Sequence, residues 1–491
     1  MSSEQVVEAL KPNSNVPLKD KISILEEFSR ALKEPVSREQ SQAIFSSTPL
    51  DLFYYGFSLE QEKLTEILCQ VVNKLMGPLS YQEIPFKFLV EGLTHYDAQI
   101  RFLSIQQVFK CLESIDFIKS MVQSEIFMHV IITLSFQDTK TAQKANELLF
   151  QISRHIPEAL FGTSSILHQL LTVETVKFRI YELMIKVASE SDQAFESCEK
   201  TGLLEAYLNE LQSQDLLVKL NAIEMLNEIA ATASGIRFLE KARLVEDMSA
   251  VLKDQDEDVV VSLVKCALIK FLGNLGENTQ VPFQKLSNDY GILENLSECL
   301  DSSNEEVVIV TISSIGLIGS HLKGLALLLS ETDLVNVLAN MYLSVVGSVK
   351  AVLIQTLSKL IGVRQEPESE LLTQDVFKQW NGFPERLIRD AKQPDDSIRI
   401  ASFALMQSIA YHSWGIESMA QSGPFLQYLL DRSTDHIQQG QIWKYTIIQT
   451  CISHPSSKQL MTDQDYDQLQ LYIHQGPFYK PLETTVAFES S

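Results

Sequence analysis

The chain has 491 residues, of which 45% are hydrophobic and 21% are charged, fractions that fit a protein with a large core and exclude intrinsic disorder. Glycine (19) and proline (15) are scarce, which favours long helices over turns and hairpins. Its 63 acidic and 40 basic residues give a formal net charge of −23, which repels phosphate backbones and anionic lipid surfaces. We therefore expect no nucleic-acid partner and no membrane partner, and a basic protein surface is a better candidate.

Cysteine usage and the N-terminal sequence predict the compartment. The six cysteines are scattered, with no CxxC pair and no histidine cluster, so neither a disulfide framework nor a zinc module is predicted. The N-terminus shows no export or organelle signal. The longest uncharged stretch, residues 307–322, is shorter than the roughly 20 apolar residues of a bilayer span. We expect a protein of the cytosol, with the nucleus as a second compartment.

Residues 1–90 contain amphipathic helical segments, but the prolines divide them into short units. These prolines are Pro12, Pro17, Pro35 and Pro49. We interpret the region as a helical N-terminal cap.

Residues 91–470 repeat a helical pattern. Each copy opens with a small polar or acidic residue, followed by an aliphatic residue three positions later, often a basic residue next, and then apolar residues at helical spacing. Clear copies begin at Asp97, Asp138, Asp215, Asp256, Asn304 and Asp395, and degenerate copies begin at 173 and 346. Successive starts are 35 to 49 residues apart, which is the range of armadillo and HEAT repeats.

The opening residue has a physical purpose, because Asp or Asn can accept hydrogen bonds from the unpaired N–H groups of a first helical turn. Second amphipathic segments, such as residues 202–211 and 334–341, lie between the copies. One helix pair cannot bury its apolar faces alone, so pairs must stack. The predicted fold is all-α, an armadillo/HEAT-like α-solenoid formed as a superhelical stack of helix pairs.

Two segments depart from the repeat. The apolar period lapses near residues 363–385, which predicts an irregular loop. Residues 471–491 contain Gly476, Pro477 and Pro481, which predict an extended C-terminal segment.

No catalytic template is present. The chain contains no glycine-rich phosphate loop, no HExxH metal pair and no GxSxG nucleophile motif, and its nine histidines lack ligand spacing. We therefore expect no enzyme activity, no cofactor and no metal.

Charged residues along the repeats allow alternative interpretations. The acidic run at residues 254–258 could meet a basic partner, but we favour a solvated turn that complements a helix N-terminus. Basic residues near the helix starts could face bound acidic segments or lie beside neighbouring acids, and the sequence leaves both open. They are Arg101, Lys177, Lys219, Lys350 and Arg399.

The candidate partner-binding residues are those nine positions after a repeat start, two helical turns along and off the apolar positions. We expect them to face the groove of an acidic solenoid: Gln106, Glu182, Glu224, Lys265 and Gln355.

Several stretches resemble a known family. They include KFRIYEL at 177–183 followed by VASES, KFLGNL at 270–275, GPF at 423–425, LDRS at 430–433, and GPFYKP at 476–481. In these stretches the chain resembles the 26S proteasome non-ATPase regulatory subunit 5 family.

The resemblance implies an armadillo-type, non-catalytic chaperone in assembly of the base of the proteasome regulatory particle. Members bind the C-terminal domain of a base ATPase, regulatory subunit seven, together with a neighbouring base ATPase and a large non-ATPase scaffold subunit, and they leave before the mature proteasome forms. We expect a monomer when the chain is free. The alternative is a generic armadillo-type adaptor for another cytosolic protein, because one fold serves many clients.

Overall fold

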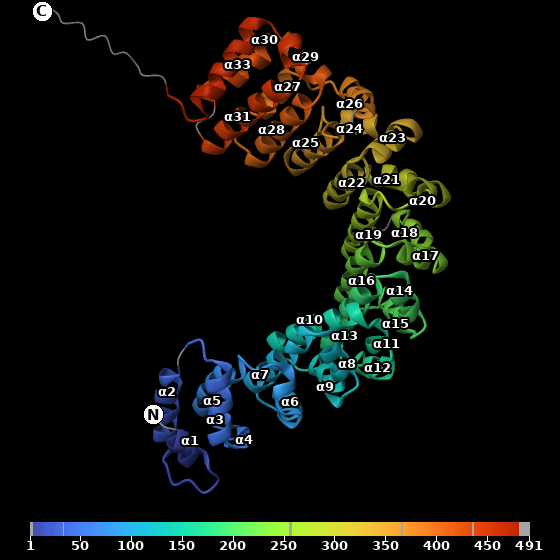
Figure 1. Cartoon of the computed structure of the whole chain (residues 1–491). Coiled ribbons are helices and arrows are strands. Elements are labelled where there is room, and N and C mark those ends of the chain that lie inside the picture. Colours follow the sequence, from blue (N-terminus) through green and yellow to red (C-terminus); the bar gives the residue numbers. More distant parts are fainter. Residues whose placement is uncertain (1–2, 33, 255–257, 365–366, 435–436, 481–491) are drawn as a thin grey trace, which may run out of the picture. The chain divides into compact units, whose positions relative to one another are not determined.

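The computed structural model describes residues 3–32, 34–254, 258–364, 367–434 and 437–480. Every regular element in these ranges is a helix (Figure 1), so the all-α prediction is confirmed. The chain divides into two compact units, Met1–Asn209 and Glu210–Ser491, which are described separately.

Unit 1 contains α1 (Ser3–Leu10), α2 (Leu18–Ala31), α3 (Arg38–Ser47), α4 (Leu50–Phe57), α5 (Glu62–Met76), η1 (Tyr81–Glu83), α6 (Phe86–Leu93), α7 (Ala98–Val108), η2 (Phe109–Glu113), α8 (Ile115–Val122), α9 (Glu125–Thr133), α10 (Thr139–His155), α11 (Pro157–Phe161), α12 (Ser164–Leu170), α13 (Glu174–Ala188) and α14 (Asp192–Glu199). Helix α15 (Leu203–Glu210) follows at the end of this unit.

Unit 2 contains α16 (Leu216–Ile229), α17 (Ala233–Lys241), α18 (Leu244–Leu252), α19 (Val259–Glu277), α20 (Phe283–Tyr290), α21 (Ile292–Cys299), α22 (Glu305–Ile318), α23 (Leu322–Glu331), α24 (Leu334–Met341), α25 (Gly347–Ile361), α26 (Glu368–Gln379), α27 (Glu385–Asp390), α28 (Asp396–Ala410), α29 (Ser413–Gln421), α30 (Gly423–Leu430), η3 (Arg432–Thr434), α31 (Gln438–Ser453), α32 (Ser457–Leu460) and α33 (Asp463–Gln475).

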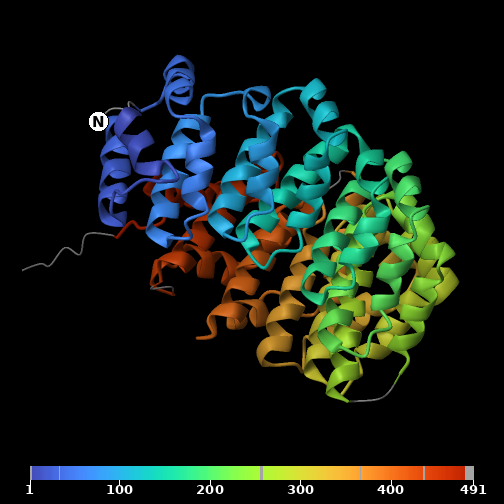
Figure 2. The same ribbon diagram turned by 90° about the horizontal axis from the view of Figure 1, so that it is seen from below.

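Each repeat contains one long helix. In unit 2 the long helices α16, α19, α22, α25, α28 and α31 pack against one another in chain order, and two shorter helices precede each of the last five (Figures 1 and 2). In unit 1, α5, α7, α10 and α13 pack in the same serial way. The predicted solenoid is therefore confirmed, and a further short helix accompanies each expected pair. Each of these additional helices, for example α17, is too short to show a recurring pattern of its own in the sequence.

The opening polar residues cap the long helices as predicted. Carboxylate oxygens of Asp97 and Asp215 accept hydrogen bonds from the N–H groups of Gln99 (2.8 Å) and Leu217 (2.9 Å). Asp138, Asn304 and Asp395 cap α10, α22 and α28 in the same way. At the degenerate starts, 173 and 346, valine provides no side-chain cap.

One predicted repeat start is in the wrong register. Position 256 lies outside the described residues, and the residue that caps α19 is Asp258, which accepts a hydrogen bond from Val260 N–H at 2.7 Å. The acidic run offers several candidate caps, and sequence periodicity alone did not select among them. The repeat therefore begins two residues later than expected.

Small residues allow the long helices of unit 2 to approach closely. A Cβ added at Gly273 on α19 would lie 2.6 Å from Ser314 Cβ on α22. Ser314 Oγ donates to the Ile269 carbonyl at 3.0 Å, and Thr356 Oγ1 on α25 donates to the Ile312 carbonyl at 3.0 Å. Side-chain hydrogen bonds to backbone thus fix the register between neighbouring repeats.

We expected an irregular loop near residues 363–385, but helix α26 forms there at Glu368–Gln379, so the prediction is wrong for those residues. Residues 365 and 366 lie outside the described part. The buried face of α26 includes Ser369 and Thr373, which hides its helical period from a search for aliphatic residues. Thr373 Oγ1 donates to the Ser369 carbonyl at 2.6 Å and accepts from Trp414 Nε1 at 3.3 Å, so these polar groups are satisfied.

The two ends of the chain also differ from a simple cap and tail. Helices of the first 90 residues join the series, since α2 packs on α5 and α5 packs on α7. At the C-terminus, α33 continues to Gln475, so residues 471–475 are helical rather than extended. Residues 476–480 have no regular structure, and residues 481–491 lie outside the described part.

Candidate protein-binding surface

Four of the five predicted partner-binding residues lie on accessible positions of long helices. Gln106 on α7 and Glu182 on α13 are half-buried, and Glu224 on α16 and Gln355 on α25 are exposed. Glu182 accepts an ion-pairing hydrogen bond from Lys186 Nζ one turn later, at 2.5 Å. The four residues occupy the same position of their repeats, nine residues after the residue that precedes each long helix.

Lys265 does not occupy that position. Because α19 is capped by Asp258, Ala267 is the ninth residue of this repeat and Lys265 is the seventh. Lys265 Nζ instead donates to the Asp254 carbonyl at the end of the preceding turn. The prediction of Lys265 followed from the misplaced repeat start.

The basic residues near the helix starts mainly bind the chain itself. Arg101 is 5% exposed and donates to the carbonyls of His95 (2.7 Å) and Tyr96 (2.6 Å). Arg399 instead lies beside a neighbouring acid, since it forms an ion pair with Asp396 at 2.6 Å. A ladder facing a bound acidic segment would need these groups to be exposed, and Arg101, Lys177 and Lys350 are buried.

Lys350 belongs to a buried polar cluster in unit 2. Its Nζ donates to the Tyr342 carbonyl at 2.7 Å and lies 3.4 Å from Asp390 Oδ2, which also accepts a hydrogen bond from Tyr342 Oη at 2.5 Å. Burial lowers the pKa of Lys350, and the Asp390 carboxylate opposes that shift. Burial also raises the pKa of Tyr342 well above its usual value, which keeps its hydroxyl a donor.

Lys444 on α31 plays a similar role, which the sequence analysis missed. It is 1% exposed and donates to the carbonyls of Tyr428 (2.8 Å) and Asp431 (2.9 Å). Its signal is a lone lysine on the apolar face of a long helix, a position that a cation occupies only when acceptors surround it.

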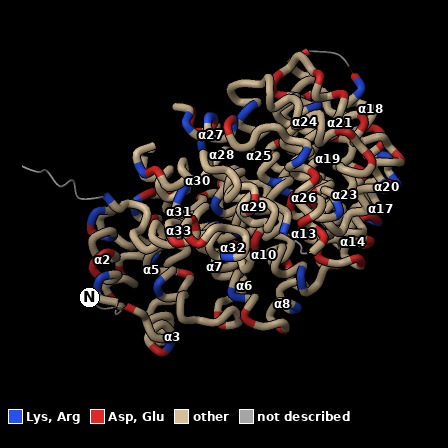
Figure 3. The backbone as a smooth tube through the Cα atoms, turned by 90° about the horizontal axis from the view of Figure 1, so that it is seen from above, with Lys and Arg blue, Asp and Glu red and all other residues tan. Residues whose placement is uncertain are grey.

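The long helices of unit 2 contain little of the chain's excess of acidic residues. Their acidic and basic residues nearly balance, and the excess of acids lies on the short helices and turns (Figure 3). Short helix α21, for example, contains Glu294 and Glu298. The long helices contain Glu224, Glu228, Glu277, Glu305, Glu306 and Asp396 against Lys219, Lys265, Lys270, Lys350, Lys359, Arg399 and Lys444. Total charge could not reveal this division, because it does not say which helices contain the acids.

Exposed aliphatic side chains lie in the first turns of two adjacent long helices of unit 2. Leu217 on α16 and Val259 on α19 are each 72% exposed, and Val260 and Leu263 are 51% and 45% exposed. Helices α16 and α19 pack together, and Asn274 Nδ2 donates to Asn227 Oδ1 between them at 3.0 Å. Contiguous exposed apolar residues are candidate surfaces for binding other molecules. We call these four residues the aliphatic patch.

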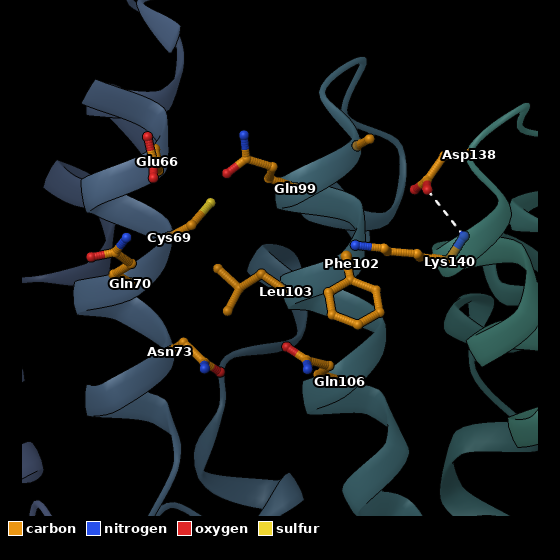
Figure 4. A pocket seen from close by; sticks show the side chains of 11 residues that line it. Glu66, Cys69, Gln70, Asn73, Gln99, Phe102, Leu103, Gln106, Asp138 and Lys140 are labelled. Carbon is orange, nitrogen blue, oxygen red and sulfur yellow. Dashed lines mark hydrogen bonds between the residues drawn. The ribbon is translucent and has the colours of Figure 1, made fainter. Parts of the chain in front are cut away.

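A hollow of about 450 Å³ lies in unit 1 between α5, α7 and the start of α10 (Figure 4). Gln106 lines it, together with the amide side chains of Gln70, Asn73 and Gln99. Phe102 faces the same space. The sequence analysis selected Gln106 but did not connect it with Gln70 and Asn73, because these two amides lie on another helix, α5.

Thiol and metal chemistry find little support in the described residues. No group of three His, Cys, Asp or Glu side chains there is placed to hold a metal ion. Burial raises the pKa of Cys69, Cys111 and Cys451 to about 12, so these thiols stay protonated near neutral pH and are poor nucleophiles.

Within the described ranges, α19 is the single helix long and apolar enough to cross a bilayer by length and composition. Helices α22 and α23 pass the same test only as a pair bent by 116°. Since α19 packs against α16, α18 and α22, we interpret it as a core helix of the repeat stack.

Comparison with known proteins decides the family. A family model described as proteasome non-ATPase 26S subunit matches residues 2–491. The chain belongs to this family. The chain is similar to the 26S proteasome non-ATPase regulatory subunit 5 of Bos taurus, with 25% identity over 94% of this chain and 98% of the bovine protein. The Homo sapiens protein of the same name is also 25% identical, over 87% of this chain and 89% of its own length.

Membership gives the chain a proteasome-related role and implies association with the proteasome regulatory particle. Solved structures with similar folds include an engineered protein with a TM-score of 0.38 and 17% identity, which covers 97% of this chain and 100% of that protein. A designed armadillo repeat protein has a TM-score of 0.38 and 16% identity, over 50% of this chain and 98% of that protein. The family and the helical solenoid are typical of non-catalytic scaffolds.

Proposed function

We propose that the chain is a non-catalytic chaperone in assembly of the base of the 26S proteasome regulatory particle. The observation that supports this most directly is the family match across residues 2–491, which includes both units. A stack of long helices also suits a protein whose task is to hold another protein.

The proposed client is the C-terminal domain of a base ATPase, regulatory subunit seven, with a neighbouring base ATPase and a large non-ATPase scaffold subunit in the same assembly intermediate. The chaperone would be a monomer when free, in the cytosol and the nucleus, and would leave before the mature proteasome forms. These finer assignments rest on the family resemblance.

The proposed contact residues are Gln106 and Glu182 in unit 1 and Glu224 and Gln355 in unit 2. The aliphatic patch adds the desolvated contact that polar side chains lack, because hot spots of binding need buried apolar area. The near balance of charge on the long helices of unit 2 makes shape and apolar contact more important there than a long-range field.

A pull-down with the full-length chain tests the proposal. We expect recovery of free base ATPases and the large scaffold subunit without the 20S core particle. Replacing Leu217 and Val260 by serine should weaken that recovery, whereas replacing Leu371, 70% exposed on short helix α26, should not. Recovery of unrelated cargo would favour a generic adaptor, and recovery of intact proteasomes would contradict release before maturation.

A further inference from the structure

Unit 2 contains a basic patch, although the chain as a whole is strongly acidic. Short helix α27 and the turn that follows it contain Arg386, Arg389 and Lys392, and basic residues (blue) lie beside α27 in Figure 3. Arg389 and Lys392 are exposed, and Arg386 is half-buried. We call these three residues the basic patch. Its charge is opposite in sign to the formal net charge of the chain, −23.

Asp390, next to Arg389 in the chain, is already paired on the other side of α27. It is 5% exposed, and its Oδ2 atom accepts a hydrogen bond from Tyr342 Oη and lies 3.4 Å from Lys350 Nζ. Its Oδ1 atom accepts a hydrogen bond from Gln393 Nε2 at 3.1 Å. Burial lowers the pKa of Lys350, Asp390 opposes this shift, and the two arginines of the basic patch add to it. The positive field of the arginines therefore persists beside the paired Asp390.

The other acids close to the basic patch in sequence do not pair with it. Asp395 caps the first turn of α28, and Asp396 forms an ion pair with Arg399. Glu385 is exposed one turn before Arg389 on α27. Neither arginine nor Lys392 forms an ion pair with any residue that the structure describes. The three cations are therefore available to carboxylates from another molecule.

Two exposed aliphatic side chains adjoin the basic patch. Leu343 is 44% exposed and Val346 is 80% exposed, and both lie in the turn between α24 and α25. Arg386 Nη1 donates to the Leu343 carbonyl at 3.3 Å, which joins α27 to this turn. The sequence from Leu334 to Arg364 contains three basic residues and no acidic residue. The combined surface is therefore cationic and apolar.

The two arginines match a pair of carboxylates in spacing. Arg386 and Arg389 are three residues apart on α27, so they lie on one side of the helix with Cβ atoms about 5–6 Å apart. In an extended segment, alternate side chains point the same way and lie about 7 Å apart. A guanidinium can bind a carboxylate through two parallel N–H groups. Two acidic residues at alternate positions of an extended segment therefore fit the two arginines.

Two observations favour a protein segment over a nucleic acid as the occupant. Leu343 and Val346 offer apolar contacts, which a phosphate backbone does not use. The field of an exposed charge extends only about 8 Å at physiological ionic strength. A long polyanion would reach beyond that distance and meet the acidic remainder of the chain, whereas a short acidic segment would not.

We propose that the basic patch, together with Leu343 and Val346, binds a short acidic segment of a partner protein, with two carboxylates at alternate positions and an aliphatic residue beside them. This inference goes beyond the proposed function and does not depend on the identity of the ATPase client.

The test uses the full-length chain and a fluorescent peptide made of two copies of Asp-Ser-Asp-Ser-Leu-Ser, with affinity measured by fluorescence anisotropy. Peptides with Asn in place of Asp, or Ser in place of Leu, separate the charged contact from the apolar one. The variant Arg389→Gln/Lys392→Gln changes two exposed side chains that form no ion pair in the described structure, so the fold should be retained. Its matched control, Lys253→Gln/Lys323→Gln, removes two exposed lysines of unit 2 outside the basic patch.

We expect the peptide to bind the wild-type chain and the control equally, and to lose at least about tenfold in affinity to Arg389→Gln/Lys392→Gln. The peptide with Asn should show a similar loss on the wild-type chain. Leu343→Ser/Val346→Ser should lose about threefold, whereas Leu371→Ser, on α26, should bind normally.

Four results would overturn the inference. They are no binding of the peptide to the wild-type chain, equal affinity for the charge variant and its control, unchanged affinity when Asn replaces Asp, and tighter binding of a fluorescent uridine oligonucleotide than of the peptide. The last result would make the patch a general anion site.

The chain's own C-terminal residues are the remaining alternative occupant. Residues 481–491, which lie outside the described residues, contain Glu483 and Glu489 and no basic residue. If the peptide binds only to a chain that lacks residues 481–491, the acidic segment that occupies the patch belongs to this chain, and the proposal of a partner protein is wrong.

Discussion

Removing the amine of Lys350 should destabilise unit 2 strongly. In Lys350→Met, Asp390 would keep its charge and its hydrogen bond from Tyr342 Oη but lose the cation 3.4 Å away, and the Tyr342 carbonyl would lose its 2.7 Å donor. The two side chains are only 10% and 7% exposed, so solvent screens their interaction little. Breaking a buried pair from one side costs about 3–5 kcal/mol.

The double variant Lys350→Met/Asp390→Asn tests the cause. It removes both charges and leaves an amide oxygen that still accepts from Tyr342, so it should be more stable than Lys350→Met alone. Urea unfolding gives the overall loss, and hydrogen exchange of peptides from α24 to α28 locates it, with α7 and α10 as an internal reference. If Lys350→Met unfolds within about 1 kcal/mol of wild type, or if the double variant is the less stable one, the buried-charge reasoning is refuted.

Three further predictions address packing, capping and pH. Gly273→Ala places a Cβ 2.6 Å from Ser314 Cβ, so it should lower stability by about 1–3 kcal/mol in urea unfolding; Gly423→Ala, with no atom within 4 Å of the new Cβ, should be nearly neutral. Asp215→Ala removes the cap that accepts from Leu217 and Val218 N–H, and should cost about 1 kcal/mol, whereas Asp215→Asn should retain most of it; an equal loss in both would contradict capping. Burial lowers the pKa of His412, so the folded chain binds this proton less tightly than the unfolded chain, and stability should fall as pH drops below about 6.5. Thermal unfolding of His412→Gln should show a smaller loss over that range, and an equal loss would assign the pH dependence to other groups.

Much of the fold follows from local rules that a sequence displays. A polar cap and an apolar stripe depend on a few neighbouring residues, so the starts at Asp97, Asp215 and Asp395 could be predicted. Helix α26 was not predicted because its buried face includes Ser369 and Thr373, whose hydrogen bonds replace the burial of aliphatic side chains. Asp258 was missed as a cap because several acids compete for that role in one short run.

The candidate sites were less predictable, because they depend on contacts between helices distant in sequence. Gln106 could be selected from its position in one repeat, whereas its relation to Gln70 and Asn73 exists only once α5 and α7 pack together. The carbonyls that accept from Lys350 and Lys444 are likewise known only once the helices are packed. The near neutrality of the long helices in unit 2 was hidden by a net charge summed over all residues.

The hydrogen bonds that join neighbouring long helices of unit 2 have a consequence for how the chain is made. Ser314 and Thr356 reach carbonyls 45 and 44 residues earlier in a chain of 491, so each inter-repeat contact closes a loop of about one repeat. Contacts this local favour rapid folding and allow a stack to grow by addition at one end. Unit 2 can therefore assemble repeat by repeat as it leaves the ribosome, each new long helix finding its acceptor carbonyls already in place.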